Sequence, residues 1–463
     1  MLVIPNRRSF LTGAAALSIS AGITGRQAFG SLPAPVAIAA GPATARLAGA
    51  ASKPAEVWAY NGAVPGTVLR ARQGQPFAAR LQNGLPQPTT VHWHGIRIDN
   101  RMDGVPGMTQ PAVQPGEGFD YLFTPPDSGT FWYHPHFSSY EQVGRGLFGA
   151  LIVDPADPAD EPIYDRDIVL VLNDWRLDGD GQLINNFGSI HDRIHAGRLG
   201  NTITVNGEVT PEIKLERFER VRIRLINAAS ARIFQLRLEN AAPKLIAVDG
   251  QGIGPENGYR EGFVLAPGNR ADFMLDVTAD TGAVLSLADW RTERNELARF
   301  TVAKTKKRDG VLVAPIALKP NAIPLPDLGR AREVPLLMTG GAKSETDMSV
   351  MAADPATIWA FNGVSGMVGN PLFTAKSGET IRMKLTNDTV WPHAIHVHGI
   401  NFRVIKHSAN PEPKPYWWDT FLLEAKETAE FAFVTPGPGH WMIHCHMLDH
   451  QAAGMDTWFV VEA

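Results

Sequence analysis

The chain has 463 residues, a formal net charge of −4 and one cysteine, Cys445. A single cysteine excludes an intramolecular disulfide framework, and the charge balance does not indicate nucleic acid or an anionic membrane as a partner. The 44 Gly, 35 Pro and 19% charged residues are typical of many short strands joined by turns. The length suits about three domains.

The N-terminus has the pattern of an export signal. Arg7 and Arg8 precede Phe10 and a weakly apolar, glycine-bearing stretch that ends near residues 28–31. This pattern is typical of a twin-arginine signal peptide, which we place at residues 1–30. It predicts the twin-arginine export machinery as a partner and a periplasmic location. Its removal would change the formal charge from −4 to −7, because it carries three arginines and no acid. No other run of about 20 apolar residues occurs, so we expect no stable membrane insertion.

One sequence unit occurs three times, at residues 60–83, 205–227 and 361–387. Each copy runs from an Asn-Gly turn into residues that alternate between apolar and polar, as in a strand with one buried face. The repeats predict three β-sandwich domains at residues 31–155, 165–308 and 330–463. Pro-rich linkers at 154–167 and 312–330 join them and should be extended.

Four His-x-His pairs lie outside the second copy, where chance placement would give on the order of 0.4 such pairs in the whole chain. They are His92 with His94, His134 with His136, His396 with His398, and His444 with His446. Imidazole suits copper, and eight of them can hold three ions. Since the pairs occur in the first and third copies only, these two domains should meet at the metal cluster.

Cys445 lies between the two histidines of the last pair. In a strand, His444 and His446 point to one face and Cys445 to the other, so one segment serves two metal sites. Cys445, His450 and Met455 form the mixed sulfur and nitrogen set of a blue copper centre with a weak axial methionine. We expect His393 to supply the second imidazole.

The motifs HWHG, HPH, HAIHVHG and HCHMLDHQAAGM resemble, in this order, the signatures of the multicopper oxidases. The bacterial three-domain laccase-like and cuprous oxidases are the most similar subgroup. The resemblance implies an all-β fold of three cupredoxin-like Greek-key β-sandwiches and four coppers. It places a type 1 copper on His393, Cys445, His450 and Met455, and a type 2 copper on His92 and His396. The type 3 pair would use His94, His134 and His446 on one ion, and His136, His398 and His444 on the other.

The resemblance also implies an enzyme that couples one-electron oxidation of a small reducing substrate to four-electron reduction of dioxygen to water. Protons are required, and copper-bound imidazoles cannot supply them. Asp103, after HWHG, and Asp449, before His450, occupy positions where the resembled enzymes carry acids near the cluster. Their alternative roles are those of a turn residue for Asp103 and of a helix or turn cap for Asp449.

The sequence does not identify the reducing substrate. A laccase-like oxidase of phenols or aromatic amines is our leading hypothesis, because Met348, Met351 and Met367 form no methionine-rich run. The alternatives are a metallo-oxidase of Cu(I) or Fe(II) in periplasmic copper tolerance and a non-enzymatic envelope protein. The third repeat and the four histidine pairs argue against a two-domain nitrite reductase. We expect a monomer.

A short helix is also predicted at residues 186–198. It would place His191 and His195 one turn apart, where they could bind a metal ion or simply form a solvated helix face.

Overall fold

The computed structural model describes residues 33–256, 262–350 and 354–463. The predicted signal at residues 1–30 and Met351 lie outside these ranges. Nearly all the regular structure is strand, in six sheets, and this confirms the predicted all-β fold. Among the described residues, no helix has both the length and the apolar character needed to cross a membrane.

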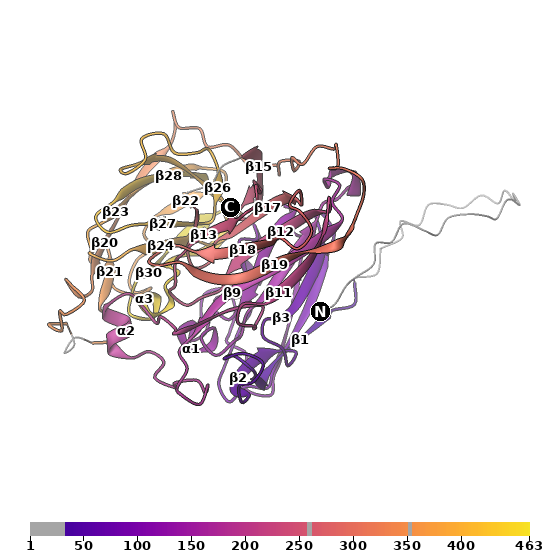
Figure 1. The fold of residues 1–463 in the computed structure, drawn as a ribbon. Helices are drawn as coiled ribbons and strands as arrows, with labels where there is room; N and C mark the ends of the chain where they lie inside the picture. Colours follow the sequence, from indigo (N-terminus) through magenta and orange to yellow (C-terminus); the bar gives the residue numbers. More distant parts are fainter. Residues whose placement is uncertain (1–32, 257–261, 351–353) are drawn as a thin grey trace, which may run out of the picture. The chain divides into compact units, whose positions relative to one another are not determined.

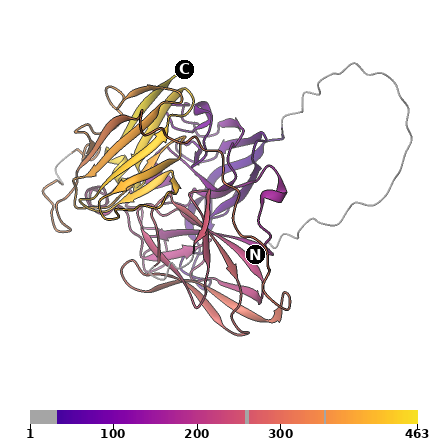
Figure 2. The same cartoon turned by 90° about the horizontal axis from the view of Figure 1, so that it is seen from above.

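The sheets occur as three successive pairs, which we name the first (residues 36–154), second (166–306) and third sandwich (332–462). Figure 2 shows them as three groups of strands that follow the colours of the sequence. The first sandwich has the sheet orders β2-β1-β4-β6 and β3-β8-β7-β5. Its strands are β1 (Val36–Ala45), β2 (Ala55–Tyr60), β3 (Gly66–Arg72), β4 (Phe77–Asn83), β5 (His92–His94), β6 (Gly118–Phe123), β7 (Gly129–His134) and β8 (Gly149–Asp154).

The second sandwich has the orders β10-β9-β12-β17-β14-β15 and β11-β19-β18-β13-β16. Its strands are β9 (Arg166–Trp175), β10 (Thr202–Val205), β11 (Glu212–Arg217), β12 (Arg220–Asn227), β13 (Phe234–Glu239), β14 (Lys244–Val248), β15 (Gln251–Glu256), β16 (Phe263–Leu265), β17 (Arg270–Asp276), β18 (Val284–Asp289) and β19 (Asn295–Lys306).

The third sandwich has the orders β21-β20-β23-β28-β25-β26 and β22-β30-β29-β24-β27. Its strands are β20 (Arg332–Gly340), β21 (Trp359–Phe361), β22 (Thr374–Lys376), β23 (Thr380–Asn387), β24 (His393–Val397), β25 (Phe402–His407), β26 (Trp417–Trp418), β27 (Thr420–Leu423), β28 (Thr428–Val434), β29 (Gly439–Cys445) and β30 (Asp456–Glu462).

Helices are few and short, and they lie in the connections: η1 (Asn100–Met102), α1 (Ser139–Gln142), η2 (Pro158–Asp160), α2 (Ile190–Ile194) and α3 (Leu448–Ala452). Figure 1 shows α2 beside α3, although more than 250 residues separate them in the chain. We predicted a helix at 186–198, and the structure has one there, α2, but it is only five residues long. Gly188 and Gly197, both with positive φ, bracket it and interrupt the helical backbone on each side.

The repeated Asn-Gly dipeptides form the same turn in each sandwich. Asn61–Gly62, Asn206–Gly207 and Asn362–Gly363 all have positive φ at both residues, as type I′ turns require. Each asparagine side chain accepts a hydrogen bond from, and donates one to, the backbone of the neighbouring strand. The sequence repeat is thus a structural repeat.

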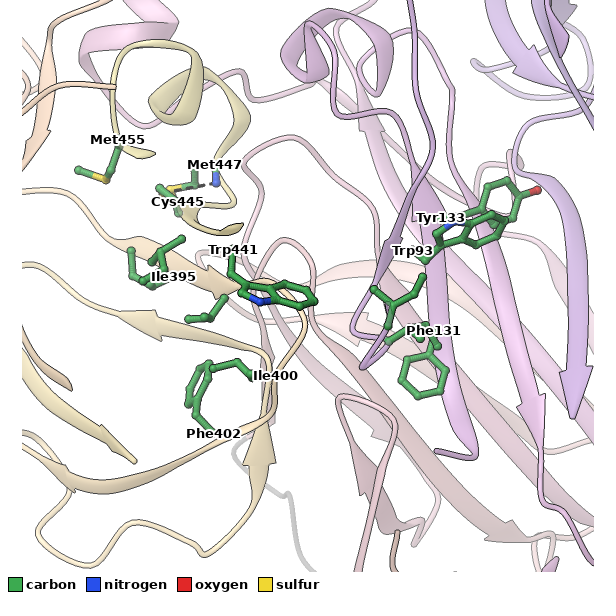
Figure 3. Packing of buried hydrophobic residues seen from close by; sticks show 14 of the residues in the cluster. Trp93, Phe131, Tyr133, Ile395, Ile400, Phe402, Trp441, Cys445, Met447 and Met455 are labelled. Carbon is green, nitrogen blue, oxygen red and sulfur yellow. Dashed lines mark hydrogen bonds between the residues drawn. The ribbon is translucent and has the colours of Figure 1, made fainter. Parts of the chain in front are cut away.

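The hydrophobic core is continuous between the first and third sandwiches. One cluster contains Trp93 and Tyr133 of the first sandwich together with Ile395, Trp441 and Cys445 of the third. Figure 3 shows these side chains on facing elements. The second sandwich has a separate core, built mainly from its own strands. The first and third sandwiches therefore pack together where the histidine pairs lie.

Candidate metal centres

Two neighbouring strands of the third sandwich carry four of the twelve predicted ligands, namely His393, His396, His444 and Cys445. β24 pairs antiparallel with β29, with Ile395 opposite Cys445 and His396 opposite His444. Because side chains alternate along a strand, Cys445 and His444 point to opposite faces of the sheet. The pairing therefore separates a cysteine site from a histidine site by a single sheet.

At the cysteine site, two imidazoles are directed at the thiol. Nδ1 of His393 lies 3.6 Å and Nδ1 of His450 3.9 Å from Sγ of Cys445, and the two nitrogens are 3.2 Å apart. All three residues are fully buried. Nε2 of His450 donates to the carbonyl of His195 at 2.6 Å. Since a carbonyl only accepts, Nε2 carries the proton and Nδ1 presents a lone pair to the site.

Met455 completes this site from the chain that follows α3. Its carbonyl accepts from the amide of Cys445, and its amide donates to the carbonyl of His450, both at 3.0 Å. Figure 3 places its side chain on the same side of the core as Cys445. The dashed line in that figure joins the amide of Met447 to Sγ of Cys445, at 3.4 Å. A buried thioether beside a thiol and two imidazoles matches the donors of a blue copper site.

The thiol of Cys445 requires a positive partner to ionise. Burial raises its pKa to about 12, although the amide of Met447 opposes this shift. A bound metal ion would favour the thiolate, and its binding would release a proton. The donor set therefore fits a soft metal ion.

The eight paired histidines meet between the first and third sandwiches, and all are buried. Nε2 of His444 lies 3.1 Å from Nε2 of His398 and 3.4 Å from Nε2 of His136. Three nitrogens about 2 Å from one ion in a trigonal arrangement would be about 3.5 Å apart. The two distances from His444, within one predicted ligand set, are close to that spacing.

The remaining paired histidines present nitrogens that lack hydrogen-bond partners within the described chain. They are Nε2 of His92, Nδ1 of His94, Nε2 of His134, Nε2 of His396 and both ring nitrogens of His446. Leaving so many buried polar atoms unpaired is costly unless a ligand satisfies them. Metal ions would do so.

The ring positions place His92 beside more than one of the predicted sets. The rings of His94, His134 and His446 lie 4.9–5.7 Å apart, so this predicted set is brought together. Ligand atoms of His92, His94 and His134 also lie within 4.8 Å of one another, as do those of His92, His396 and His398. His92 thus lies between several groups.

Burial favours the neutral form of seven of these eight imidazoles. It lowers the pKa of six of the paired histidines well below the usual range, and the neighbouring imidazoles lower it further. For His444, burial lowers the pKa to about 4. Metal ligation needs neutral imidazole, so these side chains are ready to bind at neutral pH.

Asp103 lies at the end of η1, inside the histidine cluster. Its carbonyl accepts from Nδ1 of His92 at 2.7 Å, and its Oδ2 lies 2.8 Å from Nδ1 of His398. The next residue, Gly104, has a φ of +82°, and a Cβ there would overlap the carbonyl of Val91. Asp103 therefore ends a turn and contacts two predicted ligands, and its role in proton supply stays a prediction.

Asp419 is a second carboxylate at the cluster, which the sequence analysis missed. Its Oδ1 lies 3.1 Å from Nε2 of His94, and its carbonyl accepts from Nδ1 of His396 at 2.8 Å. Arg270 of the second sandwich donates to both carboxylate oxygens at 2.8 and 2.6 Å. The sequence does mark Asp419, because it is the one acidic residue inside the largely apolar run of residues 416–423.

Asp449 lies elsewhere. It is on α3, and its Oδ2 accepts from the amide of Arg198 at 3.0 Å. Burial, and secondarily the charge of Asp192, raises its pKa to about 7. Within the described chain, no recorded hydrogen bond joins it to a paired histidine. It lies between the cysteine site and the second sandwich rather than against the histidine cluster.

The helix α2 of the second sandwich covers the cysteine site. Three consecutive carbonyls at its C-terminus accept hydrogen bonds from the third sandwich. Arg193 accepts from Nε1 of Trp359 at 2.6 Å, Ile194 from the amide of Ala342 at 2.8 Å, and His195 from His450 at 2.6 Å. The unsatisfied end of a helix is thus used to attach it to a predicted ligand.

Comparison with known proteins agrees with this arrangement. Three family models described as multicopper oxidase match residues 43–158, 166–308 and 340–463. The chain belongs to the multicopper oxidase family. It is accordingly a copper-binding oxidoreductase that uses dioxygen, as the resemblance predicted.

Its relatives share nearly the whole chain. Multicopper oxidase MmcO of Mycobacterium tuberculosis is 28% identical over 442 residues, covering 86% of this chain and 82% of its own. Copper resistance protein A of Escherichia coli is 24% identical and covers 98% and 99%. The crystal structure of a multi-copper oxidase from Pseudomonas thermotolerans has a TM-score of 0.83 and 32% identity, with 93% and 99% coverage.

Proposed function

We propose that the ligands are those of the predicted pattern. His393, Cys445, His450 and Met455 would hold the type 1 copper. His92 and His396 would hold the type 2 copper, and the type 3 pair would be held by His94, His134 and His446 and by His136, His398 and His444. The unpartnered ring nitrogens support this assignment. The coppers supply one-electron oxidation at the cysteine site and dioxygen reduction at the histidine cluster.

The strand β29 is the observation that supports the coupling of the two sites. Cys445 is bonded through the backbone to His444 and His446, which point to the opposite face. Electrons that enter at Cys445 therefore have a short covalent path to the histidine cluster. The chain accordingly performs four one-electron oxidations for each dioxygen reduced to two waters.

Carboxylates supply the protons in this proposal. Asp103 contacts His92 and His398 at the cluster, where a carboxyl group can pass a proton to reduced oxygen. Asp419 holds the corresponding position beside His94. Asp449 keeps its proposed role in proton supply too, since a pKa near 7 suits proton transfer at neutral pH. Its protons would come from the side of the molecule where α2 lies.

For the reducing substrate, we propose a phenol or an aromatic amine. Such donors give up single electrons and need no dedicated binding residues beyond access to the cysteine site. A second candidate is a metal ion such as Cu(I) or Fe(II). The hydrogen bond from Nε2 of His450 to the carbonyl of His195 favours this candidate. A phenol cannot form a hydrogen bond with that nitrogen while His195 accepts from it.

One experiment compares the candidates. Oxygen uptake by the copper-loaded protein is measured with a diphenol, an aromatic amine, Cu(I), Fe(II) and Mn(II). The laccase-like proposal expects the highest kcat/KM with the diphenol or the amine. A higher kcat/KM with Cu(I) or Fe(II) would favour the metallo-oxidase instead. No uptake with any donor would contradict the proposed ligand set.

We further propose that residues 1–30 direct export through the twin-arginine machinery to the periplasm. The paired Arg7 and Arg8 support this, because such a signal is read by a receptor. The mature chain would then consist of domains at residues 31–155, 165–308 and 330–463, and act as a monomer.

A further inference from the structure

Two histidines on α2 are not among the proposed copper ligands. The ring centroids of His191 and His195 lie 4.4 Å apart, with 35° between the ring planes. The side chain of His191 is 62% exposed, whereas His195 is only 1% exposed. The pair therefore reaches from the surface to the interior, next to the cysteine site.

The ring of His195 presents a free lone pair. Its Nδ1 lies 3.1 Å from the carbonyl of His191, so Nδ1 carries the proton and donates. Nε2 is then unprotonated, and it is buried without a hydrogen-bond partner in the described chain. A buried acceptor left unpaired is costly, and a bound cation would satisfy it.

His195 also contacts the type 1 site through its backbone. Its carbonyl accepts from Nε2 of His450 at 2.6 Å, and Nδ1 of His450 faces Cys445. A single residue thus carries both a free imidazole nitrogen and a hydrogen bond to a proposed copper ligand. An electron given up at the ring of His195 has only that residue and one hydrogen bond to cross before it reaches His450.

We propose that His191 and His195 bind Cu(I) as a reducing substrate. This rests on the proposed function, of which it specifies the metallo-oxidase candidate. Each Cu(I) loses one electron to become Cu(II), and the electron passes through His195 to the type 1 site. Four such oxidations, with four protons, reduce one dioxygen to two waters.

The surroundings of the pair favour a monovalent, imidazole-binding ion. Asp192 is the nearest carboxylate, 3.9 Å from Nδ1 of His191, but Arg176 and Arg198 both pair with it. Hard divalent ions such as Mn(II) prefer carboxylate ligands, and the arginines already occupy this one, whereas copper accepts neutral imidazole. The ring of Trp391, 5.5 Å from that of His195, adds an aromatic neighbour.

Silver(I), a redox-inert analogue of Cu(I), tests the binding directly. Calorimetric titration of the copper-loaded protein with Ag(I) should reveal a site that H191A and H195Q each weaken at least about tenfold. H195Q keeps the backbone carbonyl that holds His450. H440Q, which removes an exposed histidine beside Trp458, is the matched control and should bind Ag(I) as the wild type does. Equal Ag(I) affinity in wild type, H191A and H195Q would overturn the proposal.

A second readout separates this inference from the proposed function. In H191A the blue absorption of the type 1 site should be unchanged, while KM for Cu(I) rises about tenfold with a smaller change in kcat. An unchanged KM for Cu(I) in H191A would overturn the inference while leaving the oxidase intact. No oxygen uptake by the wild type with any donor would instead overturn the proposed function, and the Ag(I) titration would still decide whether the site exists.

Discussion

Oδ2 of Asp103, in the first sandwich, lies 2.8 Å from Nδ1 of His398, in the third. The carbonyl of the same aspartate accepts from His92 of its own sandwich. A single buried residue thus orients one imidazole from each side of the cluster. Such outer partners fix which ring nitrogen faces the metal.

The first prediction concerns Asp103 and Asp419. We expect D103N and D419N to keep the blue colour and the full copper content, because neither residue is a proposed ligand. Reoxidation of the reduced protein by dioxygen should slow at least about tenfold, since positioned acids and bases typically contribute about 10²- to 10⁴-fold. Stopped-flow mixing with dioxygen measures this step. Wild-type reoxidation rates at every pH in both variants would leave these residues with positioning roles only.

The second prediction concerns the pH dependence of stability at Asp449. Its folded pKa is raised to about 7, above the ordinary value near 4 of the unfolded chain. The favourable contribution of the neutral carboxyl is complete below about pH 4 and is lost as the pH rises to about 7, by at most about 1.4 kcal/mol per pH unit. D449N should not lose stability in this way, because asparagine carries no titrating carboxyl group.

Urea denaturation at pH 5 and pH 8 tests it. The free energy of unfolding of D449N, relative to that of the wild type, should be higher at pH 8 than at pH 5. The exposed Asp354, changed to Asn, is a control that should show no such gain. If D449N and the wild type differed by the same free energy at both pH values, the raised pKa would be wrong.

The third prediction concerns Cys445. C445S should abolish the blue colour and lower the copper content by one ion per chain, because the thiolate bond produces the colour. The fold should persist, since serine is close to cysteine in size and many other buried side chains make up the core around it. Visible absorption, copper analysis and circular dichroism check the three parts. A colourless wild type after full copper loading would exclude the type 1 assignment.

The fourth prediction concerns export. Changing Arg7 and Arg8 together to Lys should retain the precursor in the cytoplasm, because the receptor reads paired arginines rather than positive charge. Cell fractionation and immunoblotting measure the processed form. The single change Arg26→Lys, in the same segment, is the control. Processed protein in the periplasm from the doubly changed precursor would show that another route is used.

The fifth prediction concerns the attachment of α2. W359F removes the Nε1 donor to the carbonyl of Arg193 and leaves that carbonyl unpaired. It should lower the free energy of unfolding by about 1–3 kcal/mol, the usual cost of an unsatisfied buried polar group. It should also shift the blue absorption, because α2 holds His450. W458F, at a partly exposed tryptophan, should change neither property.

Local sequence patterns were sufficient for the fold and most of the candidate ligands. Alternation along strands predicted that Cys445 and His444 face opposite sides of one sheet. The three Asn-Gly dipeptides predicted three equivalent turns. These features depend on neighbours within a few residues, so a single sequence reveals them.

The long-range partners could not be predicted in the same way. Asp419 reaches His94 and Arg270, each more than 140 residues away in the sequence. His195 acts through its carbonyl, and every residue has one, so no residue type could mark it. For Asp449 the neighbouring His450 suggested a place beside the cluster, but α3 directs the carboxylate towards Arg198 instead.

The three carbonyls of α2 have a consequence for recombining relatives of this protein. The second sandwich contributes no ligand to the four proposed resident coppers, which suggests an interchangeable module for a chimera. Yet its residues 193–195 hold Trp359, Ala342 and His450. A chimera that replaced only the second sandwich would keep every ligand of the four resident coppers and still alter the colour, the redox potential and the choice of electron donor.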